Sequence, residues 1–146
     1  MSANQERLLA MQDALRQAGH RLTPQRLAVL RILADSREHP SVERIYLEVK
    51  RDFPTTSLAT IYKTVTLLKD LGQVLELGFA DGGSRYDGGR PYPHPHVICT
   101  KCGTIVDPDY PGMAAMAAEM AVKSGFKIDY HRLDFFGLCP RCQAAG

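Results

Sequence analysis

The sequence has no tryptophan, little net charge and no long hydrophobic run. Its longest apolar run, Met113 to Ala118, has six residues, whereas a membrane-spanning helix needs about 18. The opening segment MSANQERLLA also lacks the apolar core of a secretory signal peptide. We therefore expect a cytoplasmic protein with no membrane partner, in which cysteine thiols stay reduced.

The net charge of +2 does not by itself indicate a nucleic-acid-binding protein, but the charge is unevenly distributed. Between Arg16 and Lys63, nine basic residues outnumber five acidic ones, whereas from Asp81 onward each sign occurs seven times. A basic front half and a neutral back half favour two modules. The alternative explanation for the basic half is an ordinary solvated helical surface.

The front half predicts helices with recognisable start and stop signals. Gly19 ends the first helix, Thr23 and Pro24 begin the second, and Gly72 ends the last. Apolar residues at intervals of three and four give the later helices one buried stripe each. The expected helices span 3–18, 24–34, 41–53 and 57–71.

The helix over 57–71 would expose a distinct polar face. Its expected buried stripe is Leu58, Ile61, Val65 and Leu68. On the opposite side lie Lys63, Thr66 and Ala59, with Tyr62 at the border of the stripe. Strands over 74–77 and 85–87 would follow, around a turn at Asp81-Gly82-Gly83. This order of elements, helices followed by a hairpin, is typical of a winged helix-turn-helix domain, whose last helix enters the major groove of DNA.

The back half predicts a smaller module behind a hinge. The segment GGRPYPHPH, over 88–96, is rich in glycine and proline, as hinges are. Beyond it we expect strands over 97–99 and 104–106, a helix over 111–124 and a strand over 126–136. The methionines of that helix fit a core or a dimer interface better than a cofactor site. The sequence thus predicts an α+β protein, with a winged-helix domain over 1–87 and a small α/β domain over 97–146.

All four cysteines occur in two CxxC pairs, which predict a structural zinc site. The ligands would be Cys99, Cys102, Cys139 and Cys142. Two such pairs supply a tetrahedral set of sulfurs, and a module of roughly 50 residues often needs a staple of this kind. The alternatives are disulfides, which a reducing compartment disfavours, and a redox CxxC, which would not need two copies.

Three histidines and two aspartates form a second candidate metal site. His94 and His96 fall on one face of an extended chain, Asp87 and Asp107 end predicted strands, and His39 lies between two front helices. Singly, each has an ordinary explanation, such as an exposed histidine or a capping aspartate. Together, three imidazoles and two carboxylates suit Fe²⁺, Mn²⁺ or Zn²⁺. Because His39 belongs to the front module, an ion held by all five would fix the orientation of the modules.

The chain resembles the ferric uptake regulator family of bacterial metal- and peroxide-sensing repressors, from Arg21 to Cys142. The segments that carry the resemblance are RLTPQRLAVL, HPSVERIY, SLATIYKTVTLL, SRYD, HPHVICTKCGTIVD and HRLDFFGLCPRC. The resemblance implies a winged-helix domain followed by a dimerisation domain, in a homodimer that binds palindromic A·T-rich operator DNA.

The resemblance also implies roles for individual residues. The four cysteines match the ligands of a structural zinc ion. The regulatory Fe²⁺ or Mn²⁺ ligands would be His39, Asp87, His94, His96 and Asp107. The DNA contacts would be Arg21, Ser57, Thr60, Tyr62 and Lys63. Aspartate at position 107 favours the peroxide-sensing branch of the family, and Ala114 stands where other members often carry a ligand of a further metal.

In the peroxide-sensing branch, iron reacts with peroxide and oxidises a histidine ligand, here His39 or His94. This would release the metal and the DNA, and because the modification occurs once per protein we do not expect an enzyme. One alternative is an iron-, manganese- or zinc-responsive repressor of the same family without peroxide sensing. A mononuclear hydrolase would need a nearby general base, which the sequence does not supply. A thiol oxidoreductase would need a βαβ context that is missing.

Overall fold

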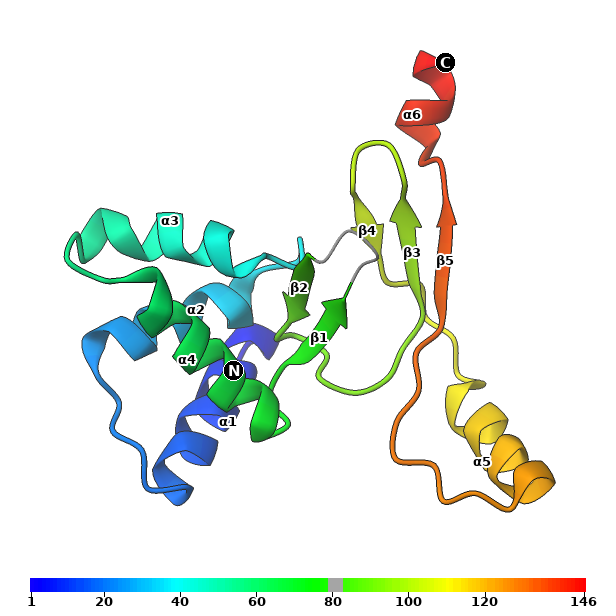
Figure 1. Ribbon diagram of the computed structural model, residues 1–146, viewed down its shortest axis with the longest axis horizontal. Coiled ribbons are helices and arrows are strands. Elements are labelled where there is room, and N and C mark those ends of the chain that lie inside the picture. The colour runs from blue at the N-terminus through cyan, green and yellow to red at the C-terminus, as the bar shows by residue number, and fades with distance from the viewer. Residues whose placement is uncertain (79–82) are drawn as a thin grey trace. The chain divides into compact units, whose positions relative to one another are not determined.

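Polar capping side chains begin the four helices of the front half (Figure 1). The helices are α1 (Ala3–Gln17), α2 (Pro24–Asp35), α3 (Val42–Asp52) and α4 (Leu58–Asp70). Ser2, Thr23, Ser41 and Ser57 each accept a hydrogen bond from the backbone N–H three residues later. The computed structural model describes residues 1–78 and 83–146. In it the chain forms two compact units, the front unit Met1–Pro91 and the rear unit Tyr92–Gly146.

The front unit has a continuous hydrophobic core. Its fully buried members are Met11, Leu15, Leu30, Leu33, Ile45, Ile61 and Leu68. The predicted buried stripe of α4 is confirmed at Ile61, Val65 and Leu68 but wrong at Leu58, which is 37% exposed. Leu58 is the first residue of α4 and its neighbours Ser57 and Ala59 are also exposed, because the helix begins beyond the edge of the core.

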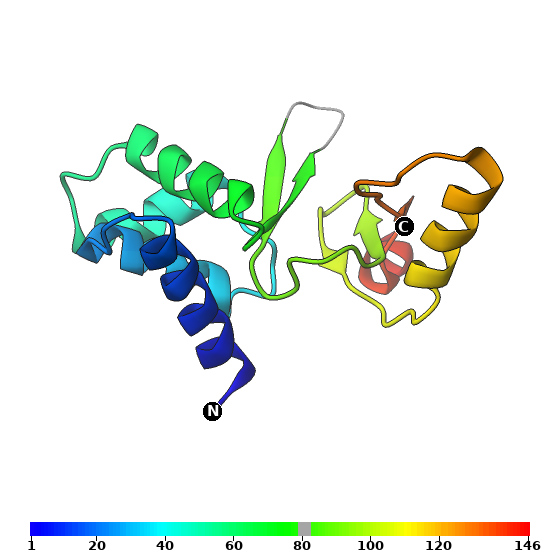
Figure 2. The ribbon, with the colours of Figure 1, turned by 90° about the horizontal axis from the view of Figure 1, so that it is seen from below.

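A two-stranded antiparallel hairpin completes the front unit beside the helices (Figure 2). Strand β1 (Leu75–Gly78) pairs with β2 (Ser84–Asp87), with Leu75 opposite Asp87. Both predicted strands are confirmed to within a residue. The predicted turn at Asp81-Gly82-Gly83 lies outside the described residues except for Gly83.

The rear unit contains a three-stranded mixed sheet and two helices. Its elements are β3 (His96–Cys99), β4 (Ile105–Val106), α5 (Met113–Ser124), β5 (Asp134–Gly137) and α6 (Pro140–Ala145). Strand β3 lies in the middle, antiparallel to β4 and parallel to β5. In Figure 1, α6 continues beyond one end of β5 and α5 lies beyond the other end of the sheet.

The predicted strand over 126–136 is wrong, since only Asp134–Gly137 is a strand. A strand needs a partner for its ladder of hydrogen bonds, and β3 offers only four residues, His96–Cys99, to pair with β5.

Helix α6 was not predicted from the sequence. Its N-terminal cap is the metal-ligand candidate Cys139, and Pro140 occupies the first helical position. Helices and strands are mixed in the protein, as expected for an α+β fold. Among the described residues, no helix is long and apolar enough to cross a membrane.

Candidate metal centres

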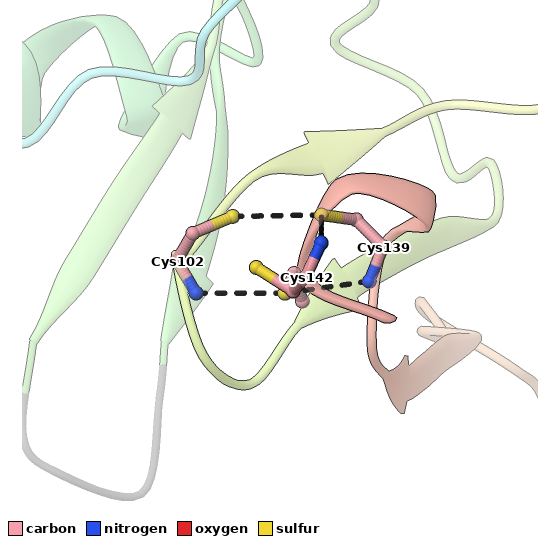
Figure 3. A group of neighbouring side chains, drawn as sticks. Cys102, Cys139 and Cys142 are labelled. Carbon is pink, nitrogen blue, oxygen red and sulfur yellow. Dashed lines mark hydrogen bonds between the residues drawn. The ribbon is translucent and has the colours of Figure 1, made fainter. Parts of the chain in front are cut away.

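The four cysteines of the rear unit lie close together, and Figure 3 labels three of them, Cys102, Cys139 and Cys142. Cys99 ends β3, Cys102 follows in the next turn, and Cys139 and Cys142 lie at the start of α6. Their sulfur atoms all lie within 4.8 Å of one another. The sulfurs of Cys102 and Cys139 are 3.8 Å apart, which matches the spacing of about 3.8 Å between thiolates around a tetrahedral zinc. No disulfide joins these cysteines, so the geometry is that of a structural zinc site.

The backbone around this cluster stabilises thiolates. The N–H groups of Cys102 and Cys139 each donate to the Cys99 sulfur at 3.4 Å, and they lower the pKa of Cys99 to about 5. A hydrogen bond with the Thr104 hydroxyl lowers the pKa of Cys102. Hydrogen bonding to Cys139 raises the pKa of Cys142 to about 12. Thiolates are the form that binds metal, and a cation would displace the proton that the cluster otherwise keeps.

The front unit holds the first His/Asp pair. The side chains of His39 and Asp87 are both buried, and Nε2 of His39 lies 3.2 Å from Oδ2 of Asp87. The other carboxylate oxygen, Oδ1, accepts hydrogen bonds from the N–H groups of Gly89 and Arg90 at 3.0 and 2.9 Å. The turn after β2 therefore fixes the carboxylate so that Oδ2 faces the imidazole.

The wing strand β2 also fixes the backbone of His39. This residue has a φ of 54°, a left-handed conformation that is uncommon for a residue with a side chain. Arg85 donates from Nε to the His39 carbonyl at 2.6 Å and from Nη2 to the carbonyl of Glu38. The N–H of Tyr86 donates to the Pro40 carbonyl at 3.0 Å. The segment that carries His39 is thus held on both sides of the histidine.

The rear unit holds the second group, two histidines around one carboxylate. Asp107 Oδ1 lies 3.7 Å from His94 Nε2 and 3.4 Å from His96 Nε2, and both imidazoles are almost fully buried. The Nδ1 of His94 is 2.7 Å from the carbonyl of Tyr92, which leaves Nε2 as its metal-binding atom.

Asp134 is a functional candidate that the sequence analysis missed. The parallel register of β3 and β5 sets His96 opposite Asp134, with 3.6 Å between His96 Nδ1 and Asp134 Oδ1. Arg132 binds the second oxygen of this carboxylate at 2.6 Å. A carboxylate on the far nitrogen orients a metal-binding imidazole and raises its basicity. No spacing in the sequence indicates this contact, because it depends on the pairing of strands distant in the chain.

The donor chemistry of both groups fits a regulatory metal. Imidazole nitrogens and carboxylate oxygens favour Fe²⁺, Mn²⁺ or Zn²⁺ over soft ions, and over Ca²⁺, which takes oxygen ligands. His39 and Asp87 lie in the front unit, whereas His94, His96 and Asp107 lie in the rear unit.

The predicted DNA-contact residues all lie exposed on the front unit. They are Arg21, Ser57, Thr60, Tyr62 and Lys63. Ser57 caps α4, and Thr60, Tyr62 and Lys63 occupy its first two turns, so α4 carries four of the five. The Tyr62 hydroxyl donates to Glu43 of α3 at 3.3 Å, and the negative charge of Glu43 raises the pKa of Tyr62.

Comparison with known proteins finds matches that span both units. The family model described as the ferric uptake regulator family matches residues 17–136. The peroxide-responsive repressor PerR of Staphylococcus aureus (strain USA300) is 42% identical over 130 residues, 89% of this chain and 87% of that protein. The Campylobacter jejuni peroxide stress regulator aligns with a TM-score of 0.71 and 31% identity, over 92% of this chain and 98% of that one. The Helicobacter pylori ferric uptake regulator aligns with a TM-score of 0.77 and 25% identity, over 96% and 93%.

Proposed function

Because the chain belongs to the ferric uptake regulator family, we propose that it is a metal-dependent, peroxide-responsive repressor that binds double-stranded DNA as a homodimer. The observation that carries this proposal is that each unit holds its own buried His/Asp group, His39 with Asp87 in the front unit and His94 and His96 around Asp107 in the rear unit. Two relatives reported above are named as peroxide regulators. The aspartate at position 107 also supports the proposal, because the family resemblance associates aspartate at this position with the peroxide-sensing branch.

The regulatory ion would be held by His39, Asp87, His94, His96 and Asp107 together. Such an ion would link the front unit, the DNA-binding domain, to the rear unit, the dimerisation domain, across the hinge at 88–96. A homodimer grips two half-sites only when its two DNA-binding domains have the correct spacing. An ion that binds the linked arrangement more tightly than the open one shifts the population toward the DNA-binding form.

The sensing step would take place on His39 or His94. Bound ferrous iron would supply the redox chemistry that activates hydrogen peroxide. One oxygen atom of peroxide would form the C2=O group of 2-oxo-histidine, the C2 hydrogen would end as a proton on a ring nitrogen, and the other oxygen would leave as water. An oxidised ring is a poorer ligand, so the ion would be lost, it would no longer link the two units, and the operator would be released. Each protein molecule is modified once, which is regulation rather than enzymatic turnover.

Large apolar side chains exposed on the rear unit support the homodimer. They include Val122, Phe126, Tyr130, Phe135 and Phe136, each at least 53% exposed. Exposed apolar groups in this number typically mark an interaction surface. On the front unit, Arg21, Ser57, Thr60, Tyr62 and Lys63 would contact an A·T-rich palindromic operator, with Tyr62 against a thymine methyl group.

Peptide mass spectrometry tests the sensing step. Anaerobic protein loaded with iron and treated with low-micromolar peroxide should gain about 16 Da, the mass of one oxygen atom, on His39 or His94 and should release DNA. Protein loaded with manganese serves as the control, and it should keep its histidines unmodified and its DNA bound. Unmodified histidines in protein that still needs metal for DNA binding would favour the metal-responsive alternative, an iron-, manganese- or zinc-responsive repressor.

A further inference from the structure

The guanidinium of Arg7 closes the base of the β1–β2 hairpin. Arg7 lies in the second turn of α1. Its Nε donates to the carbonyl of Gly88, just after β2 ends, at 2.8 Å. Its Nη2 donates to the carbonyl of Gln73, shortly before β1 begins, at 2.8 Å, and to the side-chain Oε1 of the same residue at 3.1 Å. One side chain of α1 thus holds both ends of the hairpin, 66 and 81 residues away in the sequence.

The backbone at Gly88 is also packed directly against the core. A Cβ atom at this position would lie 2.7 Å from the carbonyl oxygen of Leu33 and 2.9 Å from the side chains of Leu33 and Met11. Both of these residues are fully buried. Met11 lies one turn after Arg7 on α1, so the two side chains share a face of the helix. Helix α1 therefore holds Gly88 by a hydrogen bond and by packing at once.

The residue before Gly88 is the candidate metal ligand Asp87. Its Oδ1 accepts hydrogen bonds from two N–H groups of the turn over 89–90, and its Oδ2 lies 3.2 Å from Nε2 of His39. These contacts depend on where the backbone of the turn lies. Because Arg7 bonds to the carbonyl in the middle of this segment, it fixes the direction in which Oδ2 points.

The charge of Arg7 and its geometry act in opposite directions on a cation at Asp87. Partial burial lowers the pKa of Arg7, and the negative charge of Asp87 opposes this shift, so the two side chains interact electrostatically. A guanidinium stays protonated in proteins, and a positive charge near a cation site weakens cation binding. An arginine that acted only through its charge would lower the affinity for metal, whereas one that positions the Asp87 turn would raise it.

We propose that Arg7 is a positioning residue of the regulatory metal site, which acts through the carbonyl of Gly88 to hold Asp87 in place for the metal. This inference rests on the proposed function, because it takes Asp87 as a ligand of the regulatory ion. It makes α1, which carries none of the proposed ligands, a part of the metal centre. Residues that orient metal ligands typically raise the affinity roughly 10- to 100-fold.

Calorimetric titration of Mn²⁺ into zinc-loaded protein tests the sign of the effect. Arg7→Gln should raise the Kd for Mn²⁺ about tenfold, because the bonds at the base of the hairpin are lost. The matched control is Arg16→Gln on the same helix, since Arg16 is exposed, and its Kd should stay within about twofold of the wild-type value. Tighter or unchanged binding in Arg7→Gln would overturn the positioning role.

A double-mutant cycle shows whether Arg7 acts through Asp87. Asp87→Ala should weaken Mn²⁺ binding by itself, and adding Arg7→Gln should raise the Kd less than about twofold further, since no carboxylate is left to position. Leu15→Ala, at a fully buried position of α1, destabilises the front unit but removes no bond to the hairpin, so its Kd should change less than about twofold. Additive effects in the cycle, or a tenfold loss in Leu15→Ala, would show a merely structural role and overturn the proposal.

Hydrogen exchange gives a readout without Mn²⁺. In zinc-loaded protein, the amides of Gly89 and Arg90, which donate to Asp87, should exchange about tenfold faster in Arg7→Gln, relative to the amides of α4. Unchanged exchange at these amides would contradict the proposal. If Arg7→Gln does not fold, Gly88→Ala displaces the same peptide and gives the same tests.

The Asp87→Ala variant separates failure of this inference from failure of the proposed function. If Mn²⁺ binding depends on Asp87 but not on Arg7, the positioning role alone is overturned. If Asp87→Ala leaves Mn²⁺ binding unchanged, the proposed ligand set is overturned, and this inference with it.

Discussion

The front and rear units reach stability by different routes. Among the described residues of the front unit, thirteen side chains form one buried hydrophobic cluster, whereas the buried apolar side chains of the rear unit, cysteines apart, are Ile98, Ile105 and Met113. The rear unit instead exposes large apolar groups and gathers four sulfurs at one point. We therefore expect the stability of the rear unit to depend on a zinc ion and a second copy of the chain, and that of the front unit to depend on its own core.

Removing zinc should have the largest effect and should act on one unit. Structural zinc supplies roughly 10–16 kcal/mol of folding free energy, so a chelator or Cys142→Ser should unfold the rear unit. Hydrogen exchange should show loss of protection in β3, β4 and β5 with α2 and α4 still protected. Zinc added back to the wild-type protein is the control. Equal loss of protection in both units would contradict the comparison.

A large-to-small change in the front core should come next. Leu33 and Ile61 are fully buried, and Leu33→Ala should lower the free energy of unfolding of the front unit by about 2–5 kcal/mol. Urea denaturation of zinc-loaded protein measures it. The matched control is Leu47→Ala on α3, because Leu47 is 61% exposed and its truncation should cost less than about 0.5 kcal/mol.

Metal affinity allows a direct comparison of one supporting residue from each unit. Asp134→Asn in the rear unit and Arg85→Ala in the front unit should each lower the affinity for Mn²⁺ about tenfold, since they orient His96 and His39. Calorimetric titration of zinc-loaded protein gives the affinities. The exposed Arg37→Ala, near His39 in sequence, is the control. If only Asp134→Asn weakened binding, the rear unit alone would hold the ion.

The smallest expected effect concerns base recognition by α4. Tyr62→Ala should lower the preference for an operator, selected by the wild-type protein from a random duplex library, over random DNA by about 1 kcal/mol, because contact with a thymine methyl is lost. Lys63→Ala should weaken binding to both DNAs alike, through a phosphate contact. Competition binding with both duplexes measures the difference. An equal loss on both DNAs for Tyr62→Ala would show that this residue does not read bases.

Local signals made the helices of the front unit predictable. A capping serine or threonine and a terminating glycine act within a few residues, so α1, α3 and α4 begin and end close to the predicted positions. The same holds for the cysteine cluster, because each CxxC pair is itself a short motif. The five His/Asp ligands remain a prediction as one site, although His39–Asp87 and His94–His96–Asp107 each lie together within their own unit.

Features set by distant pairing could not be predicted. The short length of β5 follows from the length of its partner β3, and the contact of Asp134 with His96 follows from their register. Arg85 lies in the segment SRYD, but its bonds to the carbonyls of Glu38 and His39 depend on how the β1–β2 hairpin packs on the loop that carries His39. Neither periodicity nor spacing carries this information.

The parallel pairing of β3 with β5 has a consequence for how the protein matures. The two strands are joined by more than 30 residues of intervening chain, and closing such a span before any contact forms is slow. A slip of one position would also turn every side chain of β5 to the wrong face. Cys99 ends one strand and Cys139 follows the other, so capture of zinc by the two pairs aligns the strands in their correct order. We therefore expect zinc binding to guide the pairing of these strands during folding, so that a newly made chain completes its rear unit only when zinc is present.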